Sequence, residues 1–318
     1  MNAGNNDLET LDFAISVSMS KLAFLDVSDN RLSFIDLAEV PHLNNLNLDK
    51  NSLASIENLR SSRHLDTLSW REQTLVPAYG LSELQYQHCQ EIRNLYLSGN
   101  TISTLAPSTA FLNLQSLELA SAGLQNLSSD FGLRCPNLRD LNLNYNAIRD
   151  LRPLLGVMKL QKLSLAGNRV SRLRRTAAVL DRLGQELLQI DLRNNPLTVG
   201  FYTPQESSHT ERRLVPRVAP QSPMDDGNDS EGKAAKAYLL APLDREADSA
   251  SRGRLDEDTK LRRLVYEMLI VNACRTLQQL DGLEVDRIRI GRKDGVWERL
   301  VELGVLKEKS KSNGEHYE

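Results

Sequence analysis

The sequence predicts an α/β fold, a solenoid in which short parallel strands stack side by side and helices close the C-terminal end. Two observations predict it. One motif with fixed apolar positions recurs along the first two thirds of the chain, and leucine dominates the apolar residues while aromatic residues make up only 5% of the chain. Repeated use of one apolar residue type at a regular period is typical of repeat proteins, whose units bury their apolar faces only against their neighbours.

The motif is Leu-x-x-Leu-x-Leu-x-x-Asn-x-Leu, the pattern of leucine-rich repeats. It occurs eight times at spacings of 21 to 27 residues, which indicates 22-residue-type repeats, and its first position is filled by Leu22, Leu43, Leu65, Ile92, Leu114, Leu138, Leu160 and Leu187. Alternate side chains of a strand share a face. We therefore expect the Leu-x-Leu leucines to point into the core, and the residues between them to line the exposed concave face of a parallel sheet.

An asparagine follows the strand in most copies of the motif, where its amide can bond backbone groups that the turn would otherwise leave unpaired. Two copies depart from this pattern. Gln73 keeps an amide with a longer reach, whereas Ala122 has none, so we expect the backbone near Ala122 to find other partners. Trp70 stands at a leucine position of the third copy and is expected to be a large core residue.

The domain boundaries follow from where the motif begins and ends. Residues 1–21 hold a half-match at Leu8, Leu11 and Phe13, which predicts a worn or truncated repeat and leads us to expect the C-terminal portion of a longer protein. Residues 22–202 are the predicted solenoid. Prolines and acidic residues predict a disordered insertion over 203–255, within which residues 234–243 are apolar enough to dock.

Order is expected to return after the insertion, in a C-terminal cap over residues 256–305. Apolar residues between Leu261 and Leu269 fall at helical spacing, and residues 277–283 resemble a ninth strand and turn. A final helix is expected near residues 295–303, with its apolar side on the cap. Residues 306–318 are expected to be a flexible tail.

Catalytic and cofactor motifs are absent from the sequence. It contains no Gly-x-x-x-x-Gly-Lys-Ser/Thr loop, no His-Glu-x-x-His and no Cys-x-x-Cys, and its five histidines are scattered. We therefore expect no enzyme activity, no metal and no cofactor. The three cysteines, Cys89, Cys135 and Cys274, are few and far apart, which indicates reduced thiols in a cytosolic or nuclear protein.

Charge and hydropathy give no sign of a nucleic acid or a membrane as partner. The formal net charge is −3, and no apolar run approaches the roughly 18–20 residues that cross a bilayer. Basic residues do cluster without interleaved aromatic residues, which is more typical of solvated faces or protein contacts than of nucleic-acid sites. These clusters are Arg172, Arg174 and Arg175, and Arg287, Arg289, Arg292 and Lys293.

A partner protein is expected on the concave face, although the lateral loops, the insertion and the cap remain alternatives. The candidate binding residues are Arg71, Glu72, Asn94, Tyr96, Glu118, Asn142, Tyr145 and Arg193. Arg71, Tyr96 and Tyr145 are the expected anchors, because arginine and tyrosine are enriched at interface hot spots. Thr203 and Ser222 each precede a proline and are possible phosphorylation sites for a proline-directed kinase.

Two stretches resemble a particular family. The third copy of the motif ends in Trp70-Arg71-Glu72-Gln73, and the C-terminal part contains Leu280-Asp281-Gly282-Leu283 followed by Asp294-Gly295-Val296-Trp297. Together they resemble the C-terminal leucine-rich-repeat domain of the fungal spindle-pole-body scaffold of the septation-initiation and mitotic-exit networks, a family distantly related to animal centriolin. The resemblance covers about residues 1–305.

The resemblance implies a non-catalytic scaffold in the cytoplasm, on the cytoskeleton, at the outer face of the spindle pole body. Family members recruit a two-component GTPase-activating complex that restrains a small GTPase, and they bind pole-body anchors. They also assemble kinases, chiefly through an N-terminal half that this sequence does not contain. Three alternatives stay open: a regulatory leucine-rich-repeat subunit of protein phosphatase 1, a repeat subunit similar to that of the U2 particle, and an enzyme.

Overall fold

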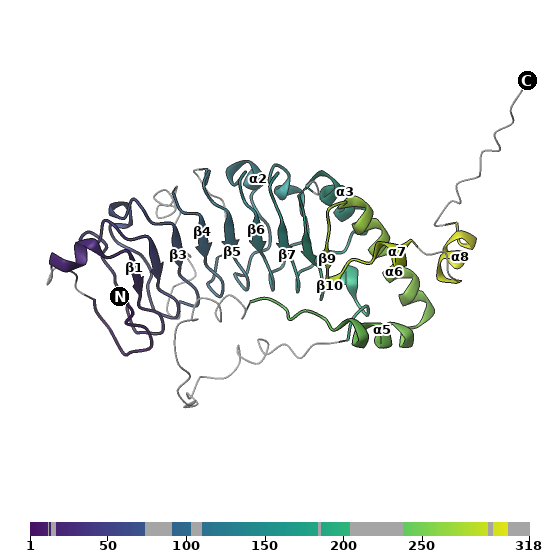
Figure 1. Ribbon diagram of the computed structural model, residues 1–318, viewed down its shortest axis with the longest axis horizontal. Helices are drawn as coiled ribbons and strands as arrows, with labels where there is room; N and C mark the ends of the chain where they lie inside the picture. Colours follow the sequence, from purple (N-terminus) through teal and green to yellow (C-terminus); the bar gives the residue numbers. More distant parts are fainter. Residues whose placement is uncertain are drawn as a thin grey trace, which may run out of the picture.

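The computed structural model describes residues 1–11, 13, 17–73, 91–102, 110–183, 186–203, 238–291 and 295–304, and the statements below concern these residues. Ser222, the Pro-rich residues 204–237 and the tail from residue 305 lie outside them. The described residues form an elongated arc, with the strands side by side along its length and helices at its C-terminal end (Figure 1).

A single sheet of ten strands runs through the molecule in sequence order. The strands are β1 (Phe24–Asp26), β2 (Asn45–Asn47), β3 (Thr67–Ser69), β4 (Asn94–Tyr96), β5 (Ser116–Glu118), β6 (Asp140–Asn142), β7 (Lys162–Ser164), β8 (Gln189–Asp191), β9 (Gln279–Leu280) and β10 (Leu283–Glu284). Pairing is parallel from β1 to β9, and β10 turns back antiparallel to β9. The middle leucines of adjacent strands are paired, from Leu25 with Leu46 onward, so the leucine-rich-repeat solenoid is confirmed.

Short helical segments lie before the first strand and between later strands. They are η1 (Val17–Lys21), η2 (Leu59–Ser61), α2 (Phe131–Arg134), η3 (Arg152–Leu154), α3 (Leu173–Leu183) and η4 (Pro196–Thr198). The motif leucines and apolar residues from these connections form one continuous buried core. Trp70 belongs to this core, as its leucine position predicts.

The asparagines after the strands tie each repeat to its neighbours, as the motif predicts. Asn51 shows the pattern: its Oδ1 accepts from the Leu32 amide at 3.0 Å, and its Nδ2 donates to the carbonyls of Val27 at 2.9 Å and Leu48 at 3.1 Å. Each amide therefore satisfies backbone groups of two repeats that are buried from water. The same arrangement recurs at Asn100, Asn146, Asn168 and Asn195.

The two departures from the asparagine pattern are resolved differently. Gln73 reproduces the bonds, because its Oε1 accepts from the Leu53 amide and its Nε2 donates to the Leu48 carbonyl, both at 3.0 Å. Ala122 has no side-chain amide, and its own carbonyl accepts directly from the Ile102 amide at 2.8 Å. A backbone bond thus replaces the missing side chain, and no gap is left in this turn.

A left-handed residue precedes the ladder position in every motif repeat, a feature that the sequence pattern did not reveal. The residues with positive φ there are Asp29, Lys50, Glu72, Gly99, Ser121, Tyr145, Gly167 and Asn194. Asparagine, aspartate and glycine adopt this conformation readily, whereas tyrosine does so at some strain. The turn that ends each strand is therefore fixed by the stacking of the repeats more than by the residue in it.

The residues of the N-terminal half-match lie at other positions of the repeat than the motif predicts. Leu8 and Phe13 do not open a strand. Instead Asn2 bridges Asp26 in parallel fashion, and the Nδ2 of Asn6 donates to the Ala3 carbonyl at 3.0 Å, as a ladder asparagine does. Residues 1–6 are the strand and turn of a further repeat, and Leu8 and Phe13 pack against the core after that turn.

The C-terminal cap covers the last repeat with helices. They are α5 (Arg245–Arg254), α6 (Glu257–Ala273), α7 (Arg287–Ile290) and α8 (Gly295–Glu302). Helix α6 packs on α3, and α8 packs on α6. Arg287 closes the carboxyl end of α6 by donating to the carbonyls of Val271 and Cys274 at 3.3 Å, which is where helices leave carbonyls unpaired.

A buried ion network fixes the cap to the solenoid. Arg263 is fully buried, donates to the Phe201 carbonyl at 2.7 Å, and pairs with Asp248 at 2.8 Å and Glu267 at 3.2 Å. Glu267 also pairs with Arg252 at 2.5 Å. Burial alone would raise the pKa of Glu267, but its arginine partners outweigh burial and lower it, so Glu267 stays ionised and holds α5 against α6.

The prediction of a disordered insertion over residues 203–255 is wrong for its C-terminal part. Helix α5 occupies residues 245–254. Residues 238–243, which we call the strap, are docked on the sheet, in agreement with the apolar character of residues 234–243. The insertion thus returns to the solenoid before the cap begins.

Candidate protein-binding face

The strap runs along the edge of the sheet at which the strands end, from α5 back toward the middle of the solenoid (Figure 1). Its last residue is joined to the cap side of the sheet, since the Leu243 amide donates to the Gly282 carbonyl at 3.2 Å. Its first residue, Tyr238, reaches the third repeat, where its hydroxyl donates to Glu72 Oε1 at 2.9 Å. A six-residue segment therefore crosses most of the C-terminal half of this edge.

Side chains of the solenoid hold the strap by its backbone. Asn144 donates to the Tyr238 carbonyl at 2.9 Å. Arg193 donates to the Ala241 carbonyl at 2.8 Å, while its guanidinium pairs with Asp191 at 2.6 Å. The side chains two residues after these strands thus form a row of hydrogen-bond donors to an extended segment.

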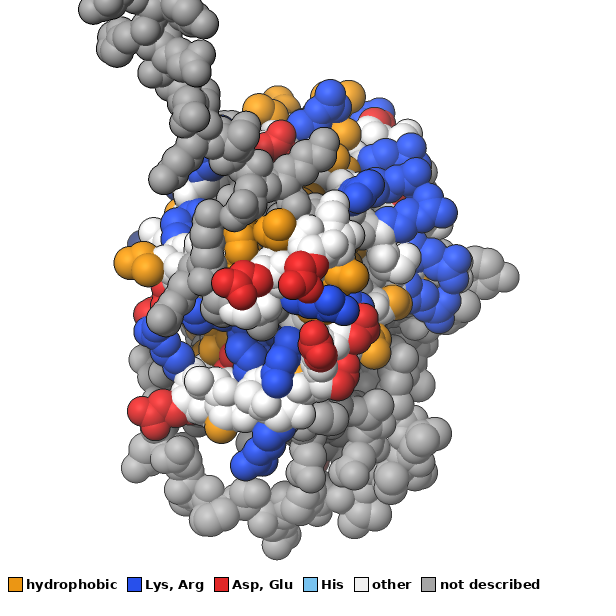
Figure 2. All heavy atoms as spheres, turned by 90° about the vertical axis from the view of Figure 1, so that its right-hand side faces the viewer, with side chains coloured by type: hydrophobic (Ala, Val, Ile, Leu, Met, Phe, Trp, Pro, Cys, Tyr) orange, Lys and Arg blue, Asp and Glu red, His pale blue; other side chains and the backbone are white. Residues whose placement is uncertain are grey.

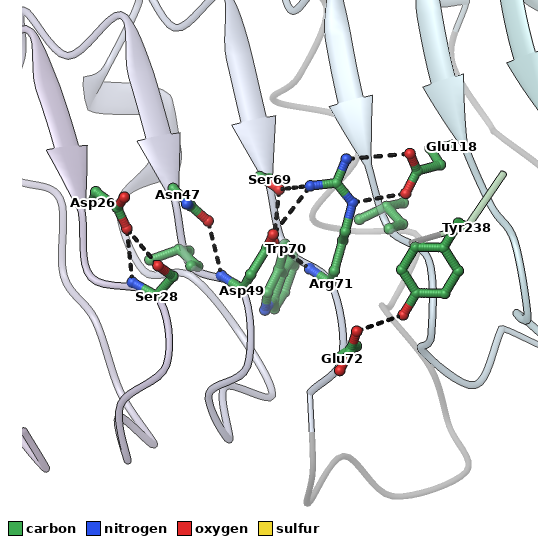
Figure 3. Close-up of polar contacts among 12 residues, drawn as sticks. Asp26, Ser28, Asn47, Asp49, Ser69, Trp70, Arg71, Glu72, Glu118 and Tyr238 are labelled. Atoms are coloured by element: carbon green, nitrogen blue, oxygen red, sulfur yellow. Dashed lines mark hydrogen bonds and ion pairs between the residues drawn. The ribbon is translucent and has the colours of Figure 1, made fainter. Parts of the chain in front are cut away.

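Arg71 is the centre of a buried polar network on the same edge (Figure 3). Its guanidinium pairs with Asp49 at 3.0 Å and with Glu118 at 2.7 Å, and it also donates to Ser69 Oγ at 2.8 Å. The ring of Tyr96 lies 4.5 Å from the guanidinium carbon. Arg71 therefore links strands and turns of the second, third, fourth and fifth repeats.

Burial and neighbouring carboxylates act in opposite directions on the pKa of Arg71 and in the same direction on the pKa of Tyr238. Burial by itself would lower the pKa of Arg71, but the carboxylates of Glu118 and Asp49 more than offset it, and the pKa is raised. Burial raises the pKa of the Tyr238 hydroxyl, and the carboxylate of Glu72 raises it further. Arg71 is accordingly always charged, and Tyr238 is always a donor near neutral pH.

The burial of several predicted binding residues corrects the expectation that all of them are exposed. Arg71, Glu118, Asn142 and Arg193 are buried; Arg71 is only 3% exposed. The cause is intramolecular, because Arg71 and Glu118 bind each other and the strap lies over Asn142 and Arg193. These four side chains bind within this chain, and Asn142 and Arg193 are covered as long as the strap is in place.

The other predicted residues remain partly accessible. Glu72, Asn94, Tyr96 and Tyr145 are half-buried. Asn94 opens β4 and Tyr96 ends it, whereas Glu72 and Tyr145 lie in turns. The structure thus does not gather the eight candidates into one exposed cluster.

The accessible part of the concave face is the row formed by the first residue of each strand from β1 to β7. Phe24 is 39% exposed, and Lys162 is also exposed. The intervening members of the row, Asn45, Thr67, Asn94, Ser116 and Asp140, are half-buried. Between β7–β9 and the strap the face is hollowed into a groove of about 540 Å³, lined by both apolar and charged side chains. This row and groove have the mixed character of a protein interface.

The predicted basic clusters differ in their roles. Arg172, Arg174 and Arg175 are exposed, beside the start of α3. Arg287 and Arg289 instead bind within the chain, to the end of α6 and to Glu267. Arg292 and Lys293 lie outside the described residues. Figure 2, which faces the cap end, shows basic side chains gathered along one flank.

The described residues contain neither a metal-binding group of side chains nor a membrane-spanning helix. None of their histidine, cysteine and acidic side chains form a group of three that could hold a metal ion. Helices long and apolar enough to cross a membrane were not found in the same part of the chain. Cys135 and Cys274 are buried, and burial raises the pKa of each thiol to about 12, so both are protonated near neutral pH. Thr203 is exposed.

Comparison with known proteins identifies the repeat family and one relative. The leucine rich repeat family matches residues 112–170. The septation initiation network scaffold protein cdc11 of Schizosaccharomyces pombe is 31% identical over 253 residues. This chain is a leucine-rich-repeat domain related to that scaffold. The match covers 80% of this chain and 23% of the relative, so the chain spans about a quarter of the scaffold's length.

Solved structures support the fold alone. The internalin inlF of Listeria monocytogenes is 21% identical, with a TM-score of 0.50, over 60% of this chain and 53% of that one. The internalin C2 of the same organism is 25% identical over 56% of this chain and 74% of that one, with a TM-score of 0.45. The septation scaffold relationship therefore rests on the sequence, and the solenoid on both sequence and structure.

Proposed function

We propose that this chain is the non-catalytic, protein-binding part of a septation-initiation and mitotic-exit scaffold at the spindle pole body. The observation that carries the proposal is the 31% identity to the septation initiation network scaffold over 80% of the chain. A phosphatase regulator is disfavoured, because the relative is a septation initiation network scaffold protein. We also propose that the protein lies at the spindle pole on the cytoskeleton, because the family resemblance implies this location.

The proposed partners are a two-component GTPase-activating complex and a pole-body anchor. The concave row offers them a surface of suitable chemistry, since it combines an exposed aromatic residue, Phe24, with amides and single charges such as Asp140 and Lys162. Aromatic side chains surrounded by polar ones commonly supply most of the binding energy of an interface. The ends of the row, Phe24 and Lys162, are the residues we expect to matter first.

A pull-down from mitotic fungal extract, with residues 1–318 as bait and mass spectrometry as readout, tests the proposal. A second bait carries Phe24→Glu and Lys162→Glu, which reverse the character of the row without touching the core. A matched control bait carries Leu133→Glu. Leu133 is 72% exposed on α2, so the control introduces the same charge away from the concave row.

Recovery of a GTPase-activating complex or a pole-body anchor by the wild-type and control baits supports the scaffold function. Loss from the Phe24→Glu, Lys162→Glu bait places the contact on the concave row. Retention by all three baits moves the contact to the lateral loops or the cap while leaving the function intact. Recovery of a phosphatase or of RNA-processing proteins alone would contradict the proposed function.

A further inference from the structure

The strap is bound in a manner that a separate peptide can reproduce. Its carbonyls at Tyr238 and Ala241 accept from the side chains of Asn144 at 2.9 Å and Arg193 at 2.8 Å. Hydrogen bonds to carbonyls do not depend on the side chains of the bound segment. This row of donors, which projects from the solenoid at the ends of the strands, therefore suits an extended segment of almost any sequence.

One side chain of the strap is recognised specifically. The ring of Tyr238 is buried, and its hydroxyl donates to Glu72 at 2.9 Å. A Cβ on Gly99 would come within 2.5 Å of the hydroxyl oxygen, so only glycine leaves room for a phenol there. A carboxylate or a phosphate in this place would be repelled by Glu72, whereas a neutral hydroxyl is bound. The pocket formed by Glu72 and Gly99 thus selects tyrosine.

The other side chains of the strap are exposed or half-buried. Leu239 is 47% exposed, and Ala241 and Pro242 are exposed as well. Tyr238 is the one strap side chain that is buried. A segment with a single buried side chain and a few hydrogen bonds stays in place because the covalent link to α5 gives it a high effective concentration.

We propose that the edge formed by Glu72, Gly99, Asn144 and Arg193 is a binding site for an extended, tyrosine-bearing segment of a partner protein. The strap is its internal occupant and is displaced when the partner binds. The partner's tyrosine takes the place of Tyr238 against Glu72, and its carbonyls accept from Asn144 and Arg193. The groove of about 540 Å³ beside the strap gives the incoming segment an opening. This binding site does not depend on which proteins the proposed scaffold recruits.

The test uses the strap itself as the probe. The full chain, either wild type or Tyr238→Ala, is added up to millimolar concentration to a fluorescent peptide with the sequence of residues 236–244. The fluorescence anisotropy of the peptide is measured at each concentration. We expect binding to Tyr238→Ala at least tenfold tighter than to wild type, since the intramolecular competitor is weakened. A peptide with phenylalanine at the tyrosine position should bind about tenfold more weakly, because it cannot donate to Glu72.

Further variants distinguish binding at this site from nonspecific binding of the peptide. Adding Glu72→Gln to Tyr238→Ala should weaken the tyrosine peptide, and the matched control Leu239→Ala should behave as wild type. A second strap variant, with residues 238–242 replaced by a glycine-serine segment of equal length, frees the site without depending on one substitution. Circular dichroism melting verifies that each variant is folded.

The proposal is overturned if neither folded strap variant binds the tyrosine peptide at millimolar concentration. It is equally overturned if wild type binds as tightly as the strap variants, or if the phenylalanine peptide binds as tightly as the tyrosine peptide. Because the assay uses only the purified chain and a peptide, its outcome is independent of the pull-down from extract.

Discussion

The two halves of the concave edge use equivalent positions of the repeat in different ways. In the N-terminal half the side chain two residues after the strand bonds to the solenoid itself: Ser28 Oγ donates to Asp26 at 2.7 Å, and Asp49 accepts from Ser69 Oγ at 2.6 Å. In the C-terminal half, Asn144 and Arg193 reach out to the strap. One template position can therefore shape a turn or bind a distant segment, and the difference lies in what covers the edge.

Arg71 stands at the border between the two halves, and its removal is expected to have the largest effect. Arg71→Met leaves the carboxylates of Asp49 and Glu118 buried without their partner. Breaking a buried ion pair from one side typically destabilises a protein by about 3–5 kcal/mol. Urea unfolding followed by circular dichroism measures the change.

A matched charge removal, Lys162→Ala, should change the free energy of unfolding by less than about 0.5 kcal/mol, because Lys162 is exposed. Equal effects of Arg71→Met and Lys162→Ala would show that the network around Arg71 contributes nothing. The two halves would then be independent.

The C-terminal half contains a buried acid that should give it a distinct dependence on pH. Asp281 accepts from the Leu192 amide and the Tyr202 and Tyr266 hydroxyls, and burial, with the nearby carboxylate of Asp191, raises its pKa to about 7. A raised acid pKa means that the contribution to stability is full below the unfolded value of about 3.9 and is lost as pH rises through 7.

Asp281→Asn should therefore flatten the decline of the unfolding free energy between pH 4 and pH 7, measured by urea titration at several pH values. The asparagine has one carbonyl oxygen, which can accept either from the Leu192 amide or from the two tyrosine hydroxyls, so the overall stability of the variant can be lower while its pH profile is flatter. An unchanged pH profile in Asp281→Asn would mean that Asp281 is ionised throughout this range in the folded chain.

A pair of glycines tests the contact between Tyr238 of the strap and the edge. Gly99 and Gly123 have nearly equal φ angles of 77° and 76°, but a Cβ on Gly99 would lie 2.5 Å from the Tyr238 hydroxyl oxygen and 2.9 Å from Glu72 Cγ, whereas a Cβ on Gly123 would meet nothing within 4 Å. Each substitution by alanine carries about 1–2 kcal/mol of left-handed strain. Gly99→Ala should be more destabilising in urea unfolding by roughly a further 1–3 kcal/mol, the range for overpacking.

The excess should shrink when Gly99→Ala is combined with Tyr238→Ala, because the clashing hydroxyl is gone. If the two glycine variants are equally stable, the strap does not press on Gly99 in solution. The distinction between a half of the edge that the strap covers and a half that it leaves uncovered would then be wrong.

The smallest expected effect belongs to the aromatic ring beside Arg71. Tyr96→Leu removes a ring 4.5 Å from the guanidinium carbon and should destabilise the chain by about 0.5–2 kcal/mol. Tyr96→Phe keeps the ring face and is the control. Loss of stability in Tyr96→Phe equal to that in Tyr96→Leu, measured by thermal melting, would assign the effect to the hydroxyl group instead.

The fold could be predicted from the sequence because its determinants are local and periodic. Leu25, Leu46 and their equivalents specify strand, face and register together, and Asn51 and its equivalents specify the turn. The repeat at residues 1–6 was missed because Ala3 replaces a motif leucine and Leu8 imitates the start of a strand.

The candidate site could be predicted only in part, because its determinants are not local. Glu118, which buries Arg71, lies 47 residues further along the chain, and Tyr238, which covers Glu72, lies 166 residues away. Periodicity identifies the positions that face the concave side. It cannot say which of them the chain itself will cover.

Arg71 also changes how the solenoid can come apart. In most repeat proteins each unit is coupled only to the next, so that unfolding can stop at any boundary. The bonds from Arg71 to Asp49 and to Glu118 couple repeats that are not adjacent, because they reach from the second repeat to the fifth. Unfolding that starts from the N-terminal end therefore has no low-energy stopping point inside this block, and repeats two to five should exchange their amide hydrogens as one cooperative unit.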